Sequence, residues 1–174
     1  MYYNKMTIWD FDENKNYIKV GNYKVLNAPD AHKTSKLLED INILINKAFT
    51  SIRLNEILTD ELYILLNTPF FLQEMQLIKD QGSIKFEGLN KPKLVKKTYK
   101  KAVGKDGNLR ASYRLIFLTL RTESGKIKTI NRLKRLIAHE LTHTALNHVT
   151  WRDDNHSFNF NYYNKLILKH LLLN

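Results

Sequence analysis

Two histidines and a glutamate in the C-terminal part of the chain have types and a spacing that suit metal chemistry. Residues 139–143 are His-Glu-Leu-Thr-His. At about 3.6 residues per turn of an α-helix, His139 and His143 lie one turn apart on the same face, and two imidazoles so placed can bind one zinc ion. Glu140 lies on the flank of that face, where its carboxylate can take a proton from a metal-activated water. The motif therefore predicts a zinc site with Glu140 as general base.

The residues around the motif favour a helix. Neither Pro nor Gly interrupts residues 126 to 150, and apolar side chains recur at helical spacing. These apolar residues are Leu133, Leu136, Ile137, Leu141, Ala145 and Leu146. The alternative is that His139 and His143 are polar residues of a helix packed partly against the core, with no metal.

A catalytic zinc site normally takes three protein ligands, so a third must follow the motif. His148 is five residues after His143, about 140° around a continuing helix, and we expect it to point away from the metal. Asp153, Asp154 and His156 come next, where the helical pattern fails and a turn can bring side chains back. We predict His156 as the third ligand.

From the motif onward the chain resembles a known family. His139-Glu-Leu-Thr-His143, a short loop, His156, Phe160 and an apolar helix from Asn161 are similar to the minimal zinc metalloproteases of the WLM and SprT-like (Spartan) groups. The resemblance covers about residues 110–172. It implies that His139, His143 and His156 are the zinc ligands and that Glu140 is the general base.

The resemblance also implies a fold and an activity. The fold would be α+β, a small zincin-like (minigluzincin) domain with a scaffold helix, a short twisted sheet, the motif helix and a C-terminal packing helix. The activity would be that of a zinc-dependent endopeptidase that acts on DNA-associated proteins, as in DNA–protein crosslink repair. In such proteases an edge strand near the zinc holds the substrate, and residues 113–120 are the candidate.

For two further roles at this site, the sequence offers more than one candidate side chain. A side chain that stabilises the oxyanion is expected, and a carboxylate should accept a hydrogen bond from a ligand imidazole. The candidates for stabilising the oxyanion are Tyr162, Tyr163 and Arg152. The candidates for accepting the hydrogen bond from a ligand imidazole are Asp153 and Asp154.

We expect one domain over residues 1–174, in three parts. Residues 1–80 should hold a hairpin around Gly21-Asn22 and scaffold helices that begin at Pro29-Asp30, either one long helix or two with a break near Thr59-Asp60. Residues 82–111 are a basic loop segment, and residues 112–174 are the catalytic core, with Asn131 as N-cap of the motif helix. Outside the motif, we expect Met75 to fill the core, His32 to cap a helix or be exposed, and His170 to interact with a helix dipole.

Composition sets the remaining limits. The chain has no cysteine, which excludes disulfides, a thiol nucleophile and a cysteine zinc site. We find no signal peptide and no apolar run of about 18 residues, so we expect no membrane contact and an intracellular setting, cytoplasmic, nuclear or viral. The net charge of +11 suits a polyanion. The candidate DNA contacts are Lys91, Lys93, Lys96, Lys97, Lys100 and Lys101.

The basic composition also supports a rival from another class. The protein could be a nucleic-acid-binding or virion-associated protein whose zinc site is structural or absent. The sequence leaves the natural substrate and the oligomeric state open.

Overall fold

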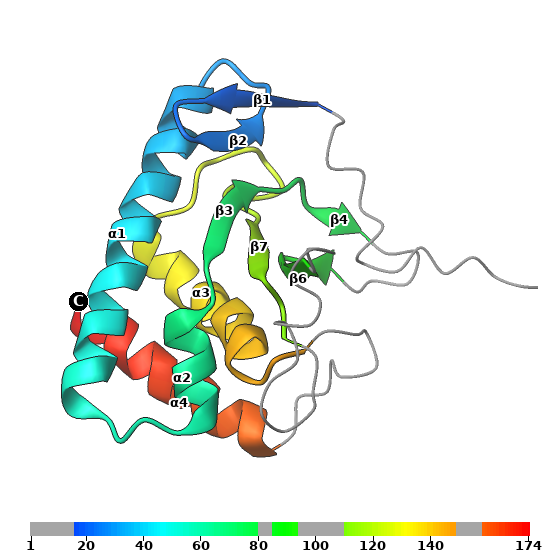
Figure 1. The fold of residues 1–174 in the computed structure, drawn as a ribbon. Helices are drawn as coiled ribbons and strands as arrows, with labels where there is room; N and C mark the ends of the chain where they lie inside the picture. Colours follow the sequence, from blue (N-terminus) through cyan, green and yellow to red (C-terminus); the bar gives the residue numbers. More distant parts are fainter. Residues whose placement is uncertain (1–15, 80–84, 94–109, 149–157) are drawn as a thin grey trace, which may run out of the picture.

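Helices and strands both build the part of the chain that the computed structural model describes, residues 16–79, 85–93, 110–148 and 158–174. The fold class is α+β, as the sequence predicts (Figure 1). In chain order the elements are β1 (Tyr17–Val20), β2 (Tyr23–Leu26), α1 (Ala31–Asn55), α2 (Asp60–Asn67), β3 (Phe70–Glu74), β4 (Ile78–Lys79), β5 (Lys85–Phe86), β6 (Gly88–Lys93), β7 (Tyr113–Leu118), α3 (Ile130–Ala145) and α4 (Phe158–Leu173). None of the described helices is long and apolar enough to cross a membrane.

The N-terminal elements follow their local sequence signals. Strands β1 and β2 pair antiparallel around Gly21, whose φ of 59° is the left-handed conformation that the turn requires. Helix α1 ends at Asn55, and α2 begins after Thr59, whose hydroxyl accepts a hydrogen bond from the Leu62 N–H at 3.3 Å. Of the two alternatives for the scaffold, two helices with a break at Thr59-Asp60 is therefore confirmed.

The three-stranded sheet has the order β3-β7-β6, with β7 in the middle. Strand β7 pairs parallel with β3 and antiparallel with β6. The prediction that residues 113–120 form the substrate-binding edge strand is therefore wrong, because both edges of β7 are already paired. The branched and aromatic residues of Tyr113–Leu118 suit a strand covered on both faces, which is where a central strand lies.

Strand β6 comes from the segment 82–111, for which the sequence predicts a basic loop. Gly88–Lys93 is instead a regular strand, and within the described residues it lies at the edge of the sheet. Pro92 is compatible with that place, because proline cannot donate to a ladder and is tolerated where its nitrogen faces away from the neighbouring strand. The rest of the basic segment, residues 94–109, lies outside the described residues.

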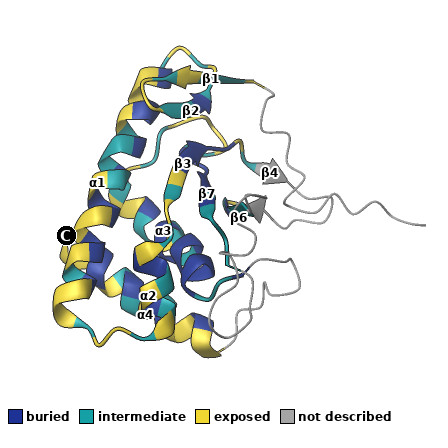
Figure 2. Cartoon of the chain, viewed as in Figure 1, coloured by how far each residue is buried: buried dark blue, intermediate teal, exposed yellow. Residues whose placement is uncertain are grey.

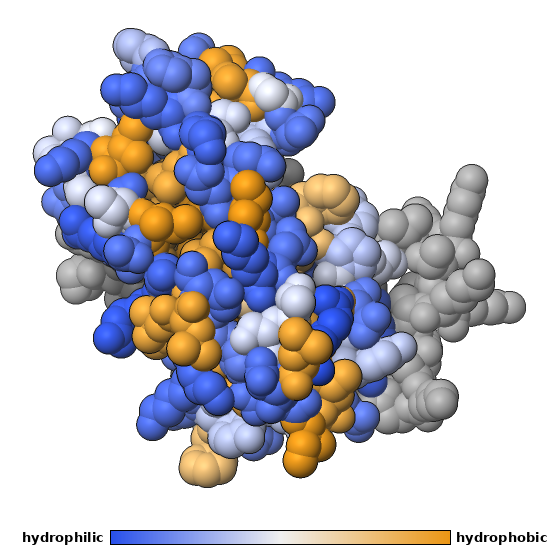
Figure 3. All heavy atoms as spheres, turned by 90° about the vertical axis from the view of Figure 1, so that its left-hand side faces the viewer, coloured by the Kyte–Doolittle hydropathy of each residue, from blue (hydrophilic) through white to orange (hydrophobic). Residues whose placement is uncertain are grey.

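The core lies where α1 and α3 meet the sheet and where α4 packs against both of these helices. Figure 1 shows α1 along one side of the sheet, with α4 crossing the C-terminal half of α1. In Figure 2 the last turns of α3 are coloured as buried. Met75 is buried against Leu89 and Phe117, so the prediction that it fills the core is confirmed. His32 is exposed, as expected. On the face shown in Figure 3, apolar residues lie in separate patches among polar ones.

His170 joins α4 to the C-terminal end of α1. Its Nδ1 lies 2.8 Å from Ser51 Oγ, and its Nε2 lies 2.7 Å from Glu56 Oε1, which also accepts from Lys169 Nζ at 2.9 Å. The side chain of His170 is buried. The helix dipole is therefore not the main reason for a histidine here, because two side chains of another helix and its following loop hold both ring nitrogens.

Glu56 gives the fold a defined dependence on pH. The hydrogen bonds from Lys169 and His170 hold the pKa of the Glu56 carboxyl below its ordinary value. Because the pKa is lower in the folded chain, this contribution to stability is present above the unfolded pKa of about 4.3 and is lost as the pH falls through the folded pKa. We expect the wild type to melt at a higher temperature than Glu56→Gln at pH 7, and this difference to shrink as the pH is lowered below about 4.3. Thermal unfolding followed by circular dichroism at a series of pH values measures both; a difference that does not change with falling pH would contradict the assignment.

Candidate metal site

Helix α3 carries the motif, and its N-terminus and apolar face fix where the motif lies. The helix begins after Thr129, whose hydroxyl accepts a hydrogen bond from the Arg132 N–H at 3.4 Å. Asn131, the predicted N-cap, is already inside the helix. The motif, residues 139–143, lies in the second half of α3. Leu133, Ile137 and Leu141 are buried, so this helix packs against the core.

His139 and His143 lie side by side, as the helical spacing predicts. Their Nε2 atoms are 3.3 Å apart, and the ring centroids are 5.0 Å apart. Two nitrogens bound to one tetrahedral zinc at about 2.0 to 2.1 Å lie about 3.3 to 3.4 Å from each other. The spacing and chemistry of these two nitrogens therefore fit a zinc ion.

Glu140 is in direct reach of the edge strand β6. Its side chain is buried, with 3% exposure. A Cβ atom added to Gly88, the first residue of β6, would lie 2.6 Å from Glu140 Oε1 and 2.8 Å from Leu136 Cδ1. Only glycine lets the backbone of β6 come so near to the Glu140 carboxylate. Gly88 lies in the segment 82–111, for which the sequence predicts a basic loop, so its place beside Glu140 was not predicted.

His148 lies beside His143, on the Nδ1 side of its ring, and not on the far side of a continuing helix as the sequence suggests. Helix α3 ends at Ala145, Asn147 takes a left-handed φ of 54°, and the His148 N–H donates to the His143 carbonyl at 3.1 Å. This reversal brings His148 Nδ1 to 2.8 Å from His143 Nδ1. The prediction assumed a continuing helix; asparagine, a common residue at left-handed helix ends, was the available signal.

Phe160, from the first turns of α4, covers the histidines. Its ring centroid lies 5.0 Å from those of both His139 and His143, and its ring is stacked on that of His148 at 6.5 Å. Phe160 is itself buried. It forms an apolar wall that keeps water from one side of the imidazoles.

A buried polar network ties the end of α3 to the sheet. Arg114, 1% exposed on β7, donates from Nη1 to Asn90 Oδ1 at 3.2 Å and to the His148 carbonyl at 2.8 Å. Asn90 Nδ2 donates to the Glu140 carbonyl at 2.6 Å and to Thr144 Oγ1 at 2.7 Å. Burial lowers the pKa of Arg114 to about 10, and its Nε and Nη2 atoms make no hydrogen bond. The network fixes the backbone on both sides of His143.

The remaining predicted site residues divide into two groups. His156, Arg152, Asp153 and Asp154 lie outside the described residues. Tyr162 is exposed, whereas the Tyr163 hydroxyl lies 2.9 Å from both Thr59 Oγ1 and Glu61 Oε2, and burial raises its pKa. Tyr163 is thus bound to the start of α2 and is poorly placed to stabilise an oxyanion. Within the described ranges, no group of three or more His, Cys, Asp or Glu side chains is arranged to hold a metal.

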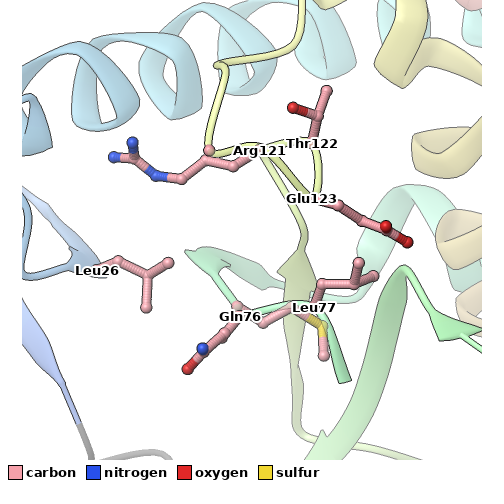
Figure 4. A pocket seen from close by; sticks show the side chains of 8 residues that line it. Leu26, Gln76, Leu77, Arg121, Thr122 and Glu123 are labelled. Atoms are coloured by element: carbon pink, nitrogen blue, oxygen red, sulfur yellow. The ribbon is translucent and has the colours of Figure 1, made fainter. Parts of the chain in front are cut away.

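A hollow of about 490 Å³ lies elsewhere on the molecule (Figure 4). Its walls come from the end of β2, the segment after β3 and the loop after β7. The lining residues are Leu26, Met75, Gln76, Leu77, Arg121, Thr122, Glu123 and Gly125. None belongs to the His-Glu-Leu-Thr-His motif, so this hollow is separate from the candidate metal site.

Comparison of the chain with protein-family models, with curated proteins and with solved structures gives no match. The resemblance to WLM and SprT-like proteases therefore depends on the motif, its spacing and the aromatic residue that follows.

Proposed function

We propose that the protein is a zinc-dependent endopeptidase of the H-E-x-x-H type with a zincin-like arrangement of helix and edge strand. The observation that carries the proposal is the separation of 3.3 Å between the Nε2 atoms of His139 and His143, which matches two ligands of one zinc ion. His156 remains the predicted third ligand. The buried carboxylate of Glu140, beside the edge strand, supports the same chemistry.

Each of these residues has a separate task. When bound, zinc supplies a Lewis acid that polarises a peptide carbonyl and lowers the pKa of water. His139 and His143 would bind the zinc through their Nε2 atoms, and Phe160, which packs against both rings, would limit access of bulk water. Glu140 takes the proton of the attacking water and then passes it to the leaving amine. No side-chain nucleophile is needed.

The edge of β6 is the proposed place for the substrate backbone. The Thr119 N–H donates to the Glu87 carbonyl, and the alternation of an antiparallel ladder then turns the backbone groups of Gly88, Asn90 and Pro92 away from β7. Gly88 and Asn90 can each donate and accept there, whereas Pro92 can only accept. An extended peptide added to this edge would run beside the Glu140 carboxylate, because the backbone of Gly88 lies close to it.

Replacing Gly88 with alanine tests this arrangement. The added Cβ would have to displace the Glu140 carboxylate and the Leu136 side chain, so we expect peptide hydrolysis to fall at least tenfold and stability to fall by about 1–3 kcal/mol. Gly125→Ala is the matched control, because its Cβ would meet nothing within 4 Å while its φ of 85° still strains the backbone. It should cost stability and leave hydrolysis intact. Equal activity of Gly88→Ala and wild type would contradict the proposed place of Glu140.

The net charge of +11 supports protein substrates that are attached to DNA, because a basic protein is attracted to a polyanion. Of the candidate DNA contacts, Lys91 and Lys93 lie on β6, whereas Lys96, Lys97, Lys100 and Lys101 lie outside the described residues. Strand β6 would thus carry positive charge next to the peptide-binding edge. The same charge favours the second candidate, a nucleic-acid-binding or virion-associated protein whose zinc is structural or absent.

Metal content separates the two candidates. We expect about one zinc per chain in wild type and in Glu140→Gln, and none in His143→Ala or His156→Ala, when protein purified without chelators is measured by mass spectrometry. His32→Ala, a change at an exposed histidine of α1, is the control and should keep its zinc. Wild-type protein without zinc would refute the protease and leave the nucleic-acid-binding candidate. Zinc without hydrolysis of any peptide would favour a structural metal.

A further inference from the structure

We infer that His148 is a positioning residue that holds His143 in the tautomer with the proton on Nδ1, so that His143 Nε2 stays available to a metal. The inference deepens the proposed function and rests on it for the identity of the metal. The contact that carries it is the distance of 2.8 Å between His143 Nδ1 and His148 Nδ1.

The chemistry of imidazole makes this contact selective. A neutral imidazole has one N–H donor and one lone-pair acceptor. If the shared proton is on His143 Nδ1, then His143 Nε2 keeps its lone pair, and this nitrogen is the one that lies 3.3 Å from His139 Nε2. If the proton is on His148 Nδ1, then His143 Nε2 is protonated and cannot bind a metal. Ligand histidines commonly donate their second ring N–H to a fixed acceptor, and His148 Nδ1 is such an acceptor.

His148 cannot be the third ligand through the atom that makes this contact. That atom faces Nδ1 of His143, whereas the proposed metal lies on the Nε2 side of the same ring. The two sides of an imidazole point in nearly opposite directions. His148 therefore acts on the site through His143.

Three elements hold the His148 acceptor in place. The His148 N–H donates to the His143 carbonyl at 3.1 Å, and the His148 carbonyl accepts from Arg114 Nη1 of β7 at 2.8 Å. From α4, the ring of Phe160 stacks on the His148 ring with 13° between the planes. With 8% exposure, the His148 ring is shielded from solvent. An acceptor fixed in this way loses little freedom when it bonds His143, which is what a positioning residue requires.

Two variants separate the acceptor from the ring. His148→Phe removes the acceptor and keeps an aromatic ring against Phe160, whereas His148→Asn places an oxygen acceptor close to the position of Nδ1. We expect His148→Phe to bind zinc about 10- to 100-fold more weakly than wild type, and His148→Asn to recover most of that loss. Competition with a chromophoric chelator measures the affinity. Zinc affinity in His148→Phe equal to that of wild type would overturn the inference and leave the proposed function standing.

A second readout needs no metal. In the metal-free protein, nitrogen-15 NMR of the imidazoles should show the proton of wild-type His143 on Nδ1, and in His148→Phe a shift of the population toward Nε2–H. A wild-type His143 protonated on Nε2 would overturn the inference. This result needs only the wild-type protein, so it holds even if His148→Phe fails to fold. If wild type binds no zinc, the proposed function fails, and this tautomer measurement still decides the role of His148.

Discussion

Replacing Glu140 with glutamine is expected to slow peptide hydrolysis by about 10²- to 10⁴-fold, the range that a general base contributes. Glutamine has nearly the shape of glutamate, so it can occupy the buried space beside Gly88 and Leu136. Its amide cannot take a proton from water. Fold and zinc content should therefore stay those of wild type, and the loss should appear in kcat.

Cleavage of a fluorogenic peptide, followed for wild type and Glu140→Gln at equal zinc content, measures this loss. Glu56→Gln is the matched control, because it removes the same charge from the contact between α1 and α4 and touches none of the motif residues. It should hydrolyse the peptide at the wild-type rate at pH 7. Equal rates for Glu140→Gln and wild type would refute the role of Glu140 as general base, whatever the metal content.

Replacing Glu74 with alanine is expected to lower the free energy of unfolding by about 3 kcal/mol, the lower end of the cost of breaking a buried ion pair. Glu74 is fully buried at the end of β3. Its carboxylate accepts from Arg121 Nε at 2.9 Å and from the Leu26 N–H at 3.1 Å. The change would leave the Leu26 N–H without its acceptor. Asp30 would still form an ion pair with Arg121 at 2.8 Å, so we expect the lower end of the range of energies.

Urea unfolding of wild type, Glu74→Ala and Glu74→Gln measures this cost. Glutamine keeps one of the two oxygen acceptors and loses the charge, so its loss of stability should be smaller than that of alanine, which keeps neither acceptor. The pair joins β2, β3 and the loop after β7, and none of the motif residues takes part in it. A stability of Glu74→Ala within about 0.5 kcal/mol of wild type would show that the network contributes nothing measurable.

Where the sequence predicts well, the physical cause is local. The place of His139 beside His143 follows from the period of one helix, and the hairpin follows from Gly21-Asn22 between two short apolar runs. The break between α1 and α2 follows from a threonine that caps the next helix. Each of these features depends on residues within a few positions of one another.

Where the sequence predictions are wrong, a distant or missed contact is the cause. The apolar run Tyr113–Leu118 looks the same at an edge or in the middle of a sheet, and only the pairing with β6 and β3 decides which it is. His148 was placed by continuing a helix that in fact ends at Ala145. Pro92 and Asn147 were the local signals, for an edge strand and for a helix end.

The sequence by itself determined the α+β class, the two adjacent histidines with Glu140, and the +11 charge. It also supplies the prediction of His156 as third ligand. Only the tertiary structure decided that β6 is the edge strand, that Gly88 meets Glu140, and that His148 bonds His143. The physical reason is that helix periodicity is set by neighbours one turn away, whereas strand order and the close approach of a backbone to a side chain are set by packing between segments far apart in the chain.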